Sequence, residues 1–203
     1  MYKKIVFLCA LFCPSIQHAY NLTPWFEIKP SYFLFTSSVM HDVYHKGGFE
    51  IQGSVSVPFY DLPVISDSSL EFYTSIGIRG AWGHALNSGE KTKLIVMPFD
   101  IGLKPVFRLC EHYYYFFAIG PRFFYFNQHN DSLYVSPKVS GGGVGFFINT
   151  GCNIQIMGHF LIGIVGEYSY ETKTISPTMI NVYSNGRTQL GGLAFGINFG
   201  YLF

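Results

Sequence analysis

The chain has 203 residues, of which 12% are charged and 19% aromatic, and its formal net charge is +1. A typical soluble domain carries about 25% charged residues. The apolar content is too high for a disordered chain, and no basic excess is available to bind nucleic acid. After the first residues, no segment approaches the about 18 uncharged apolar residues of a spanning helix, which argues against a helical membrane protein.

Residues 1–19 have the features of a secretory signal peptide. Lys3 and Lys4 form a positively charged start, residues 5–13 are an unbroken apolar run, and Ala19 supplies a small residue at the cleavage position. We therefore expect an exported protein.

The mature chain would retain two cysteines, Cys110 and Cys152. Two are too few for a fold held together by disulfides. Both are expected at the same rim, with Cys110 in a turn and Cys152 on the lipid-facing side of its strand. A bond would need a bulge or a twist at the rim, so we expect none.

Apolar and polar residues alternate with a period of two along the rest of the chain. In one example, Ile51, Val55 and Val57 alternate with small or polar residues. This period is typical of strands that have two different faces, and helical spacing does not explain it. Eight segments alternate in this way, at approximately 25–36, 48–60, 70–82, 94–109, 113–128, 143–156, 160–172 and 188–203.

The connections between these segments differ in length in a regular way. Those after the fourth and sixth segments are only a few residues long, and the gap at 61–69 is the exception. The long, polar gaps follow the first, third, fifth and seventh segments, at Ser37–Gly47, Gly83–Lys93, His129–Gly142 and Lys173–Arg187. Long loops at one rim and short turns at the other are typical of an up-and-down barrel.

The composition of the two faces predicts which one is outside. A soluble barrel of the lipocalin kind would also alternate, with its apolar face inward. Here the polar face carries too few charges for a soluble exterior, and the other face is rich in Phe, Ile, Leu and Tyr. Strands that span a bilayer must close, because every backbone polar group needs a partner. The sequence predicts an all-β fold, a closed antiparallel up-and-down eight-stranded transmembrane β-barrel.

The last segment carries a resemblance to a known group. Its apolar residues alternate up to the final position, as Leu193, Phe195, Ile197, Phe199, Tyr201 and Phe203. With the signal peptide and eight strands, the chain resembles the small bacterial outer-membrane barrels, which include the OmpA transmembrane domain, OmpX and OmpW-like proteins. The resemblance implies the bacterial cell outer membrane, contact with its lipid, and an assembly signal at Phe199, Tyr201 and Phe203 for the barrel-assembly machinery.

Five prolines fall inside the expected strands. They are Pro30, Pro58, Pro98, Pro105 and Pro121. Proline cannot donate to the ladder, and a closed barrel has no edge strand to accommodate it. We therefore expect some of these residues at bulges or near the rims.

With Phe203 facing lipid, the parity of each strand predicts ten charges in the lumen. They are Glu27, Lys29, Glu50, Glu71, Arg79, Asp100, Lys104, Arg108, Arg122 and Glu167. Five acids and five bases are expected to pair across the lumen in two levels, one near each rim. A salt-bridged plug that fills the barrel is favoured over a gated polar path or a proton-linked site, because eight strands leave room only for side chains.

The sequence gives only weak evidence for a catalytic or metal-binding site. His129 and Ser132 lie in one polar loop, where such pairs occur by chance. His41 and His45 have the spacing of a metal pair, and His84 shares their rim, but no third ligand or helical pattern supports a site. We expect no enzyme activity, no metal and no cofactor.

The expected protein is one barrel domain over residues 20–203. Its predicted role is structural or one of surface interaction, with four exposed loops. The alternative is an OmpW-like conduit for small or hydrophobic molecules. Expected partners are outer-membrane lipid, the barrel-assembly machinery, and other envelope or host surface proteins that contact the loops, but not nucleic acid.

Overall fold

The computed structural model describes residues 24–62, 68–86, 89–131, 138–174 and 187–203. The predicted signal peptide, residues 1–19, lies outside these ranges. Within them, no helix has the length and apolar character needed to cross a membrane.

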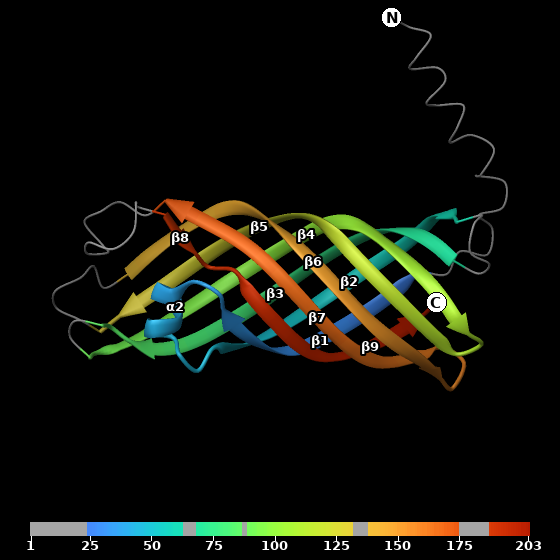
Figure 1. Ribbon diagram of the computed structural model, residues 1–203, viewed down its shortest axis with the longest axis horizontal. Helices are drawn as coiled ribbons and strands as arrows, with labels where there is room; N and C mark the ends of the chain where they lie inside the picture. The colour runs from blue at the N-terminus through green and yellow to red at the C-terminus, as the bar shows by residue number, and fades with distance from the viewer. Residues whose placement is uncertain (1–23, 63–67, 87–88, 132–137, 175–186) are drawn as a thin grey trace, which may run out of the picture.

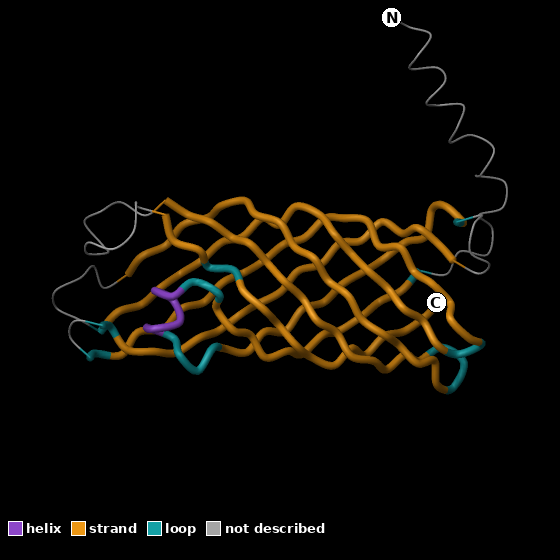
Figure 2. Tube along the Cα trace, in the orientation of Figure 1, coloured by secondary structure: helices purple, strands orange, loops and turns teal. Residues whose placement is uncertain are grey.

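Eight long antiparallel strands close into a barrel (Figures 1 and 2). Each strand pairs with its neighbours in sequence, β6 pairs with β7, and the last strand pairs with both β7 and β1. The predicted fold class is therefore confirmed. The strands are β1 (Trp25–Phe35), β2 (Gly48–Asp61), β3 (Ser68–His84), β4 (Lys91–Cys110), β5 (Tyr113–Asn130), β6 (Lys138–Ile156), β7 (Phe160–Thr174) and β9 (Gly192–Leu202).

The eighth expected segment, 188–203, is divided into two strands. A short strand, β8 (Arg187–Gln189), pairs only with β7, and β9 begins after Leu190 and Gly191. Leu190 is buried inside the barrel mouth. A Cβ atom on Gly191 would overlap the carbonyl oxygen of Ser169, so the two backbones approach closely at this glycine. One continuous strand was therefore the wrong expectation.

Two other differences concern the long gaps. The gap at residues 37–47 contains a short helix, α2 (Ser38–Val43), which the sequence did not predict. The gaps at 83–93 and 129–142 are partly strand, because β3 and β4 remain paired as far as His84 and Lys91 and β6 begins at Lys138. Antiparallel pairing thus continues into polar sequence beyond the apolar belt.

The five prolines are accommodated in two ways. Pro58 lies at a bulge between β2 and β3, as expected. The other four, Pro30, Pro98, Pro105 and Pro121, pair with one neighbouring strand while the register with the other neighbour skips them. Each missing N–H therefore leaves a gap on one side of the ladder.

The barrel wall separates apolar side chains outside from polar ones inside. On β2, for example, Ile51 is 50% exposed while the neighbouring Gln52 is 3% exposed. Exposed aromatic residues occur towards both ends of the strands, at Trp82, Tyr125 and Tyr170 near the loops and at Tyr113, Tyr115 and Phe203 near the turns. This arrangement is typical of aromatic girdles at the two membrane interfaces.

Cys110 and Cys152 are both free and exposed. Cys110 ends β4 opposite Tyr113, and Cys152 on β6 lies opposite Tyr115 on β5. The structure therefore agrees with the expectation of two unbonded thiols at the turn-side rim.

Phe203→Asp is expected to reduce membrane insertion sharply. The Phe203 N–H donates to the Pro24 carbonyl, and its exposed ring lies 5.3 Å from that of Tyr201, which places it at the end of the lipid-facing apolar row. The measurement is the fraction of protein whose migration on a gel changes on boiling. Phe160→Asp, at the same rim and 53% exposed, is the matched control for charge alone. Equal loss in both variants would contradict an assembly role for the terminal residue.

Candidate functional site in the barrel interior

A first layer of buried charge lies towards the short turns, and we call it the turn-side layer. Its centre is Glu27 on β1, whose Oε2 lies 3.2 Å from Lys29 Nζ and 3.0 Å from Lys104 Nζ. The other oxygen, Oε1, accepts hydrogen bonds from Asn198 at 2.7 Å and Asn153 at 3.3 Å. A carboxylate withdrawn from water is thus surrounded by donors on β4, β6 and β9 and by Lys29 on its own strand.

Aromatic rings support the two lysines of this layer. Lys29 Nζ donates to the Tyr73 hydroxyl at 3.1 Å and lies 4.8 Å from the centre of that ring. Lys104 Nζ lies 4.4 Å from the Trp25 ring and 4.7 Å from that of Phe116. A cation over a ring face is stabilised most where water is excluded. Glu71, also fully buried, completes the layer and accepts a hydrogen bond from Ser69.

A second layer, the loop-side layer, is built around two arginines. Arg122 on β5 donates to both oxygens of Asp100, from Nε at 2.6 Å and from Nη2 at 2.7 Å. Its Nη1 lies 2.7 Å from Glu167 and 3.3 Å from Glu171, both on β7. A two-pronged contact of this kind fixes orientation as well as charge. One guanidinium therefore connects β4, β5 and β7 across the lumen.

Arg79 on β3 forms the second half of the loop-side layer. It binds Glu50 at 3.0 Å and Glu171 at 3.3 Å, and its guanidinium lies 3.5 Å from the centre of the Phe33 ring. The amide of Gln52 donates to Glu50 at 2.8 Å and to Glu167 at 3.2 Å. Gln52 thereby links the carboxylates that pair with Arg79 to those that pair with Arg122 in one network.

Between the layers lies a small cavity of about 10 Å³, with Lys29, Gln52, Asn149 and Glu167 in its lining. This is about the space that one water molecule needs. Both polar atoms of the buried Asn149 side chain lack a hydrogen-bond partner in the protein. This cavity between the described side chains therefore has room for about one water molecule.

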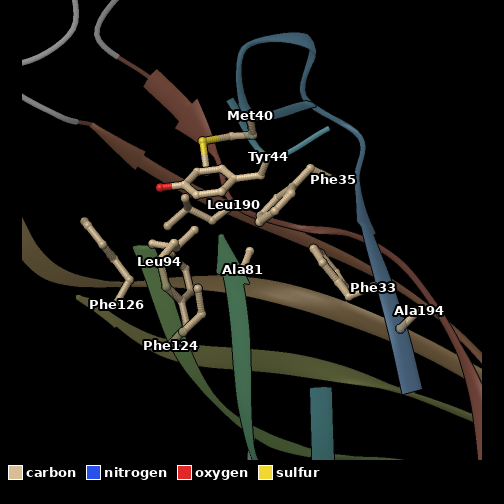
Figure 3. Close-up of a cluster of buried hydrophobic side chains, with 11 residues drawn as sticks. Phe33, Phe35, Met40, Tyr44, Ala81, Leu94, Phe124, Phe126, Leu190 and Ala194 are labelled. Carbon is tan, nitrogen blue, oxygen red and sulfur yellow. The ribbon is translucent and has the colours of Figure 1, made fainter. Parts of the chain in front are cut away.

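Above the loop-side layer, apolar side chains fill the mouth of the barrel. Met40 and Tyr44, from α2 and its C-terminal end, lie over Leu190 and Phe35 in Figure 3. Tyr44 is 1% exposed, its hydroxyl lies 3.1 Å from that of Thr92, and burial raises its pKa to about 12. We call this group the apolar plug; it consists of Phe35, Met40, Tyr44, Leu94, Phe126 and Leu190.

The structure buries every charge predicted for the lumen except Arg108. That residue is exposed and donates to the Glu111 carbonyl at 2.8 Å. Arg108 still pairs in register with Tyr114, and the β4–β5 register shifts only after it, so Arg108 keeps the inward parity of Lys104 and lies at the rim, where its side chain is exposed. Its expected place among the paired charges of the lumen was therefore wrong.

One buried charge was missed by the sequence reasoning. Glu171 is fully buried and has the parity of Glu167, four residues before it, so the same alternation could have found it. Among the described residues, the buried charges are six acids and four bases, not five of each. They are Glu27, Glu50, Glu71, Asp100, Glu167 and Glu171 against Lys29, Arg79, Lys104 and Arg122.

The histidines do not assemble into a site in the described part of the chain. His41 and His45 are exposed on the first loop, and His129 lies 3.6 Å from Asp131. Ser132, the other member of the loop pair considered above, lies outside the described residues. Across the described ranges, no group of three His, Cys, Asp or Glu side chains could hold a metal ion.

No family model matches the chain, and no curated protein matches it either. Solved structures do. The outer membrane protein OprG from Pseudomonas aeruginosa is 13% identical, with 90% of this chain and 94% of that chain covered and a TM-score of 0.55. Ail of Yersinia pestis, in complex with the heparin analogue sucrose octasulfate, is 12% identical. The match covers 90% of this chain and 97% of that chain, with a TM-score of 0.53. Neisserial surface protein A is 12% identical, with 90% of this chain and 97% of that chain covered and a TM-score of 0.52.

These likenesses define the class by fold. The chain has the fold of the small bacterial outer-membrane barrels. In the described residues, paired charges and the apolar plug fill much of its interior.

Arg122→Met is expected to lower the free energy of unfolding by about 3–5 kcal/mol, because three buried carboxylates lose a counter-ion. The measurement is the urea midpoint of the refolded protein in detergent or vesicles. Arg108→Met is the matched control, because this exposed arginine lies outside the buried network and donates to the Glu111 carbonyl in a turn. Its free energy of unfolding is expected to change by no more than about 0.5 kcal/mol. Equal midpoints for both variants would mean that the interior charges are hydrated.

Proposed function

We propose that this protein is an integral component of the bacterial outer membrane with a non-catalytic role, acting as a closed scaffold that presents its loops. The apolar outer face supports residence in a bilayer. It includes Phe72 at 57%, Ile76 at 67% and Ile164 at 69% exposure, which a soluble protein would bury. The alternating wall and the aromatic residues at both ends are those of membrane barrels.

The observation that carries the closed state is the filled lumen. Two charged layers, rings packed around their cations, and the apolar plug follow one another from the turns to the loops. Eight-stranded barrels have interiors just wide enough for side chains. An ion that crossed would have to break several buried ion pairs, so a scaffold is favoured over the conduit.

Presentation of loops is supported by the way the first loop is anchored. Met40 and Tyr44 are buried in the plug, while His41, Asp42 and His45 are exposed between and beside them. Burial of one side of α2 therefore holds the polar side at a fixed place above the barrel. The Ail structure, which contains a heparin analogue, supports the idea that this fold suits a surface-binding role.

Single-channel recording tests the closed scaffold. The refolded protein in a planar bilayer is expected to show no sustained conductance. Met40→Ser combined with Tyr44→Ser opens only the plug, so this variant is expected to stay closed because the charged layers lie beneath it. Discrete, long-lived openings of the unaltered protein would contradict the scaffold and favour the conduit.

Location is tested separately. The mature protein is expected in the outer-membrane fraction, with migration on a gel that changes on boiling, because a closed barrel resists detergent until heated. Recovery in the soluble periplasmic fraction would contradict the assignment of the apolar face to lipid.

A further inference from the structure

The outer wall is not uniform: one sector carries a groove. Strands β9, β1, β2, β3 and β4 line a depression of about 660 Å³, within the size range of pockets that hold small ligands. Its sides are aromatic, with Tyr32, Phe49, Trp82 and Phe195 among the lining residues. Gly80 also lines it, and a Cβ atom there would lie 3.3 Å from the Trp82 ring, so the absence of a side chain leaves space beside that ring.

The groove reaches the loop-side rim. Phe49 is the second residue of β2, and Trp82 lies two residues before the end of β3. Deeper in the wall, Ile51 and Ile78 face each other across the same two strands. Four residues separate Ile78 from Trp82, a rise of about 13 Å along the strand. The groove therefore runs from the rim into the apolar belt.

Its rim end is positively charged. Lys93 lines the groove, pairs with Trp82 in the β3–β4 register, and places Nζ 5.8 Å from the Trp82 ring. Lys91, two residues earlier on β4, is exposed with the same parity. The Tyr32 hydroxyl donates to the Lys46 carbonyl, which brings the basic end of the first loop to the same edge. An apolar channel that ends at lysines matches an acyl chain attached to an anionic headgroup.

We propose that this groove is a binding site for a phosphate-bearing membrane lipid, with an acyl chain against the aromatic walls and the phosphate at Lys93. The inference rests on the proposed function, since it requires the loop-side rim to lie at headgroup depth in a bilayer. A lysine near an anionic lipid surface contributes about 1 kcal/mol, which corresponds to an about five-fold preference for the anionic lipid.

The chain supplies its own reporter for a test. It has two tryptophans, of which Trp25 is 4% exposed in the lumen and Trp82 is 58% exposed in the groove. In Trp25→Phe, all tryptophan fluorescence comes from Trp82. The unaltered protein gives the same comparison if that variant does not fold, because Trp25 is out of reach of lipid chains.

The experiment compares quenching of Trp82 by chain-brominated phosphatidic acid and by chain-brominated phosphatidylcholine, at equal mole fraction in phosphatidylcholine vesicles. The expected result is an about five-fold preference for phosphatidic acid, lost in Lys93→Gln. Lys138→Gln is the matched control: this exposed lysine begins β6, outside the groove, so the preference is expected to remain.

Two outcomes would overturn the site and leave the proposed function intact. Equal quenching by both lipids in an inserted, heat-modifiable barrel would make the groove an ordinary part of the lipid-facing wall. Quenching by neither lipid in such a barrel would mean that another occupant, such as a second copy of the chain, covers Trp82. Failure to insert at all would overturn the proposed function together with the site.

Discussion

The structure depends on one constraint: a charge in a narrow interior without water must have an opposite charge and hydrogen-bond donors within reach. Arg122 satisfies it with Asp100, Glu167 and Glu171, and Glu27 satisfies it with Lys29 and Lys104. Apart from Lys29, which shares β1 with Glu27, these partners come from different strands. A one-residue slip of a strand that carries one of these charges would turn that charge towards lipid and leave its partners unpaired. Pairing across the lumen therefore fixes the register that closes the barrel.

The same constraint explains why the interior is filled. Long cationic side chains lie over rings, as Arg79 does over Phe33 and Lys104 over Trp25. Rings next to the cations displace water, which strengthens each pair and leaves only a small cavity between the layers. The apolar plug then separates the loop-side layer from solvent at the mouth. The outer face of the wall is mostly apolar, and the lipid-binding groove proposed there depends on Lys93 at the rim.

The sequence predicted the strands and most of the interior because both follow from a period of two. The face of a strand residue follows from its own position in the alternating pattern. Glu27 and Asp100 could therefore be placed inward without knowing which residues they contact. Parity gives the face of a side chain but not its depth in the barrel: Arg108 has the inward parity, yet it is exposed because it lies near the end of β4. Parity also gave no sign that the last strand divides between Gln189 and Gly192.

Other features depend on contacts between distant residues and could not be predicted. Met40 and Tyr44 become the core of a plug only once Leu94, Phe126 and Leu190 meet them across the mouth. The one-sided gaps at Pro30 and Pro98 likewise require knowing both neighbouring strands. Glu171 was predictable in principle, since it shares the parity of Glu167.

The interior charges are paired with one another and shielded from water. A double-mutant cycle on Arg122 and Asp100, with Arg122→Met and Asp100→Leu singly and together, measures the free energy that couples them. Unfolding in urea is expected to give a coupling of about 1–3 kcal/mol, because the two side chains share two hydrogen bonds of 2.6 and 2.7 Å. Effects that add to within about 0.5 kcal/mol would contradict a dry, paired interior.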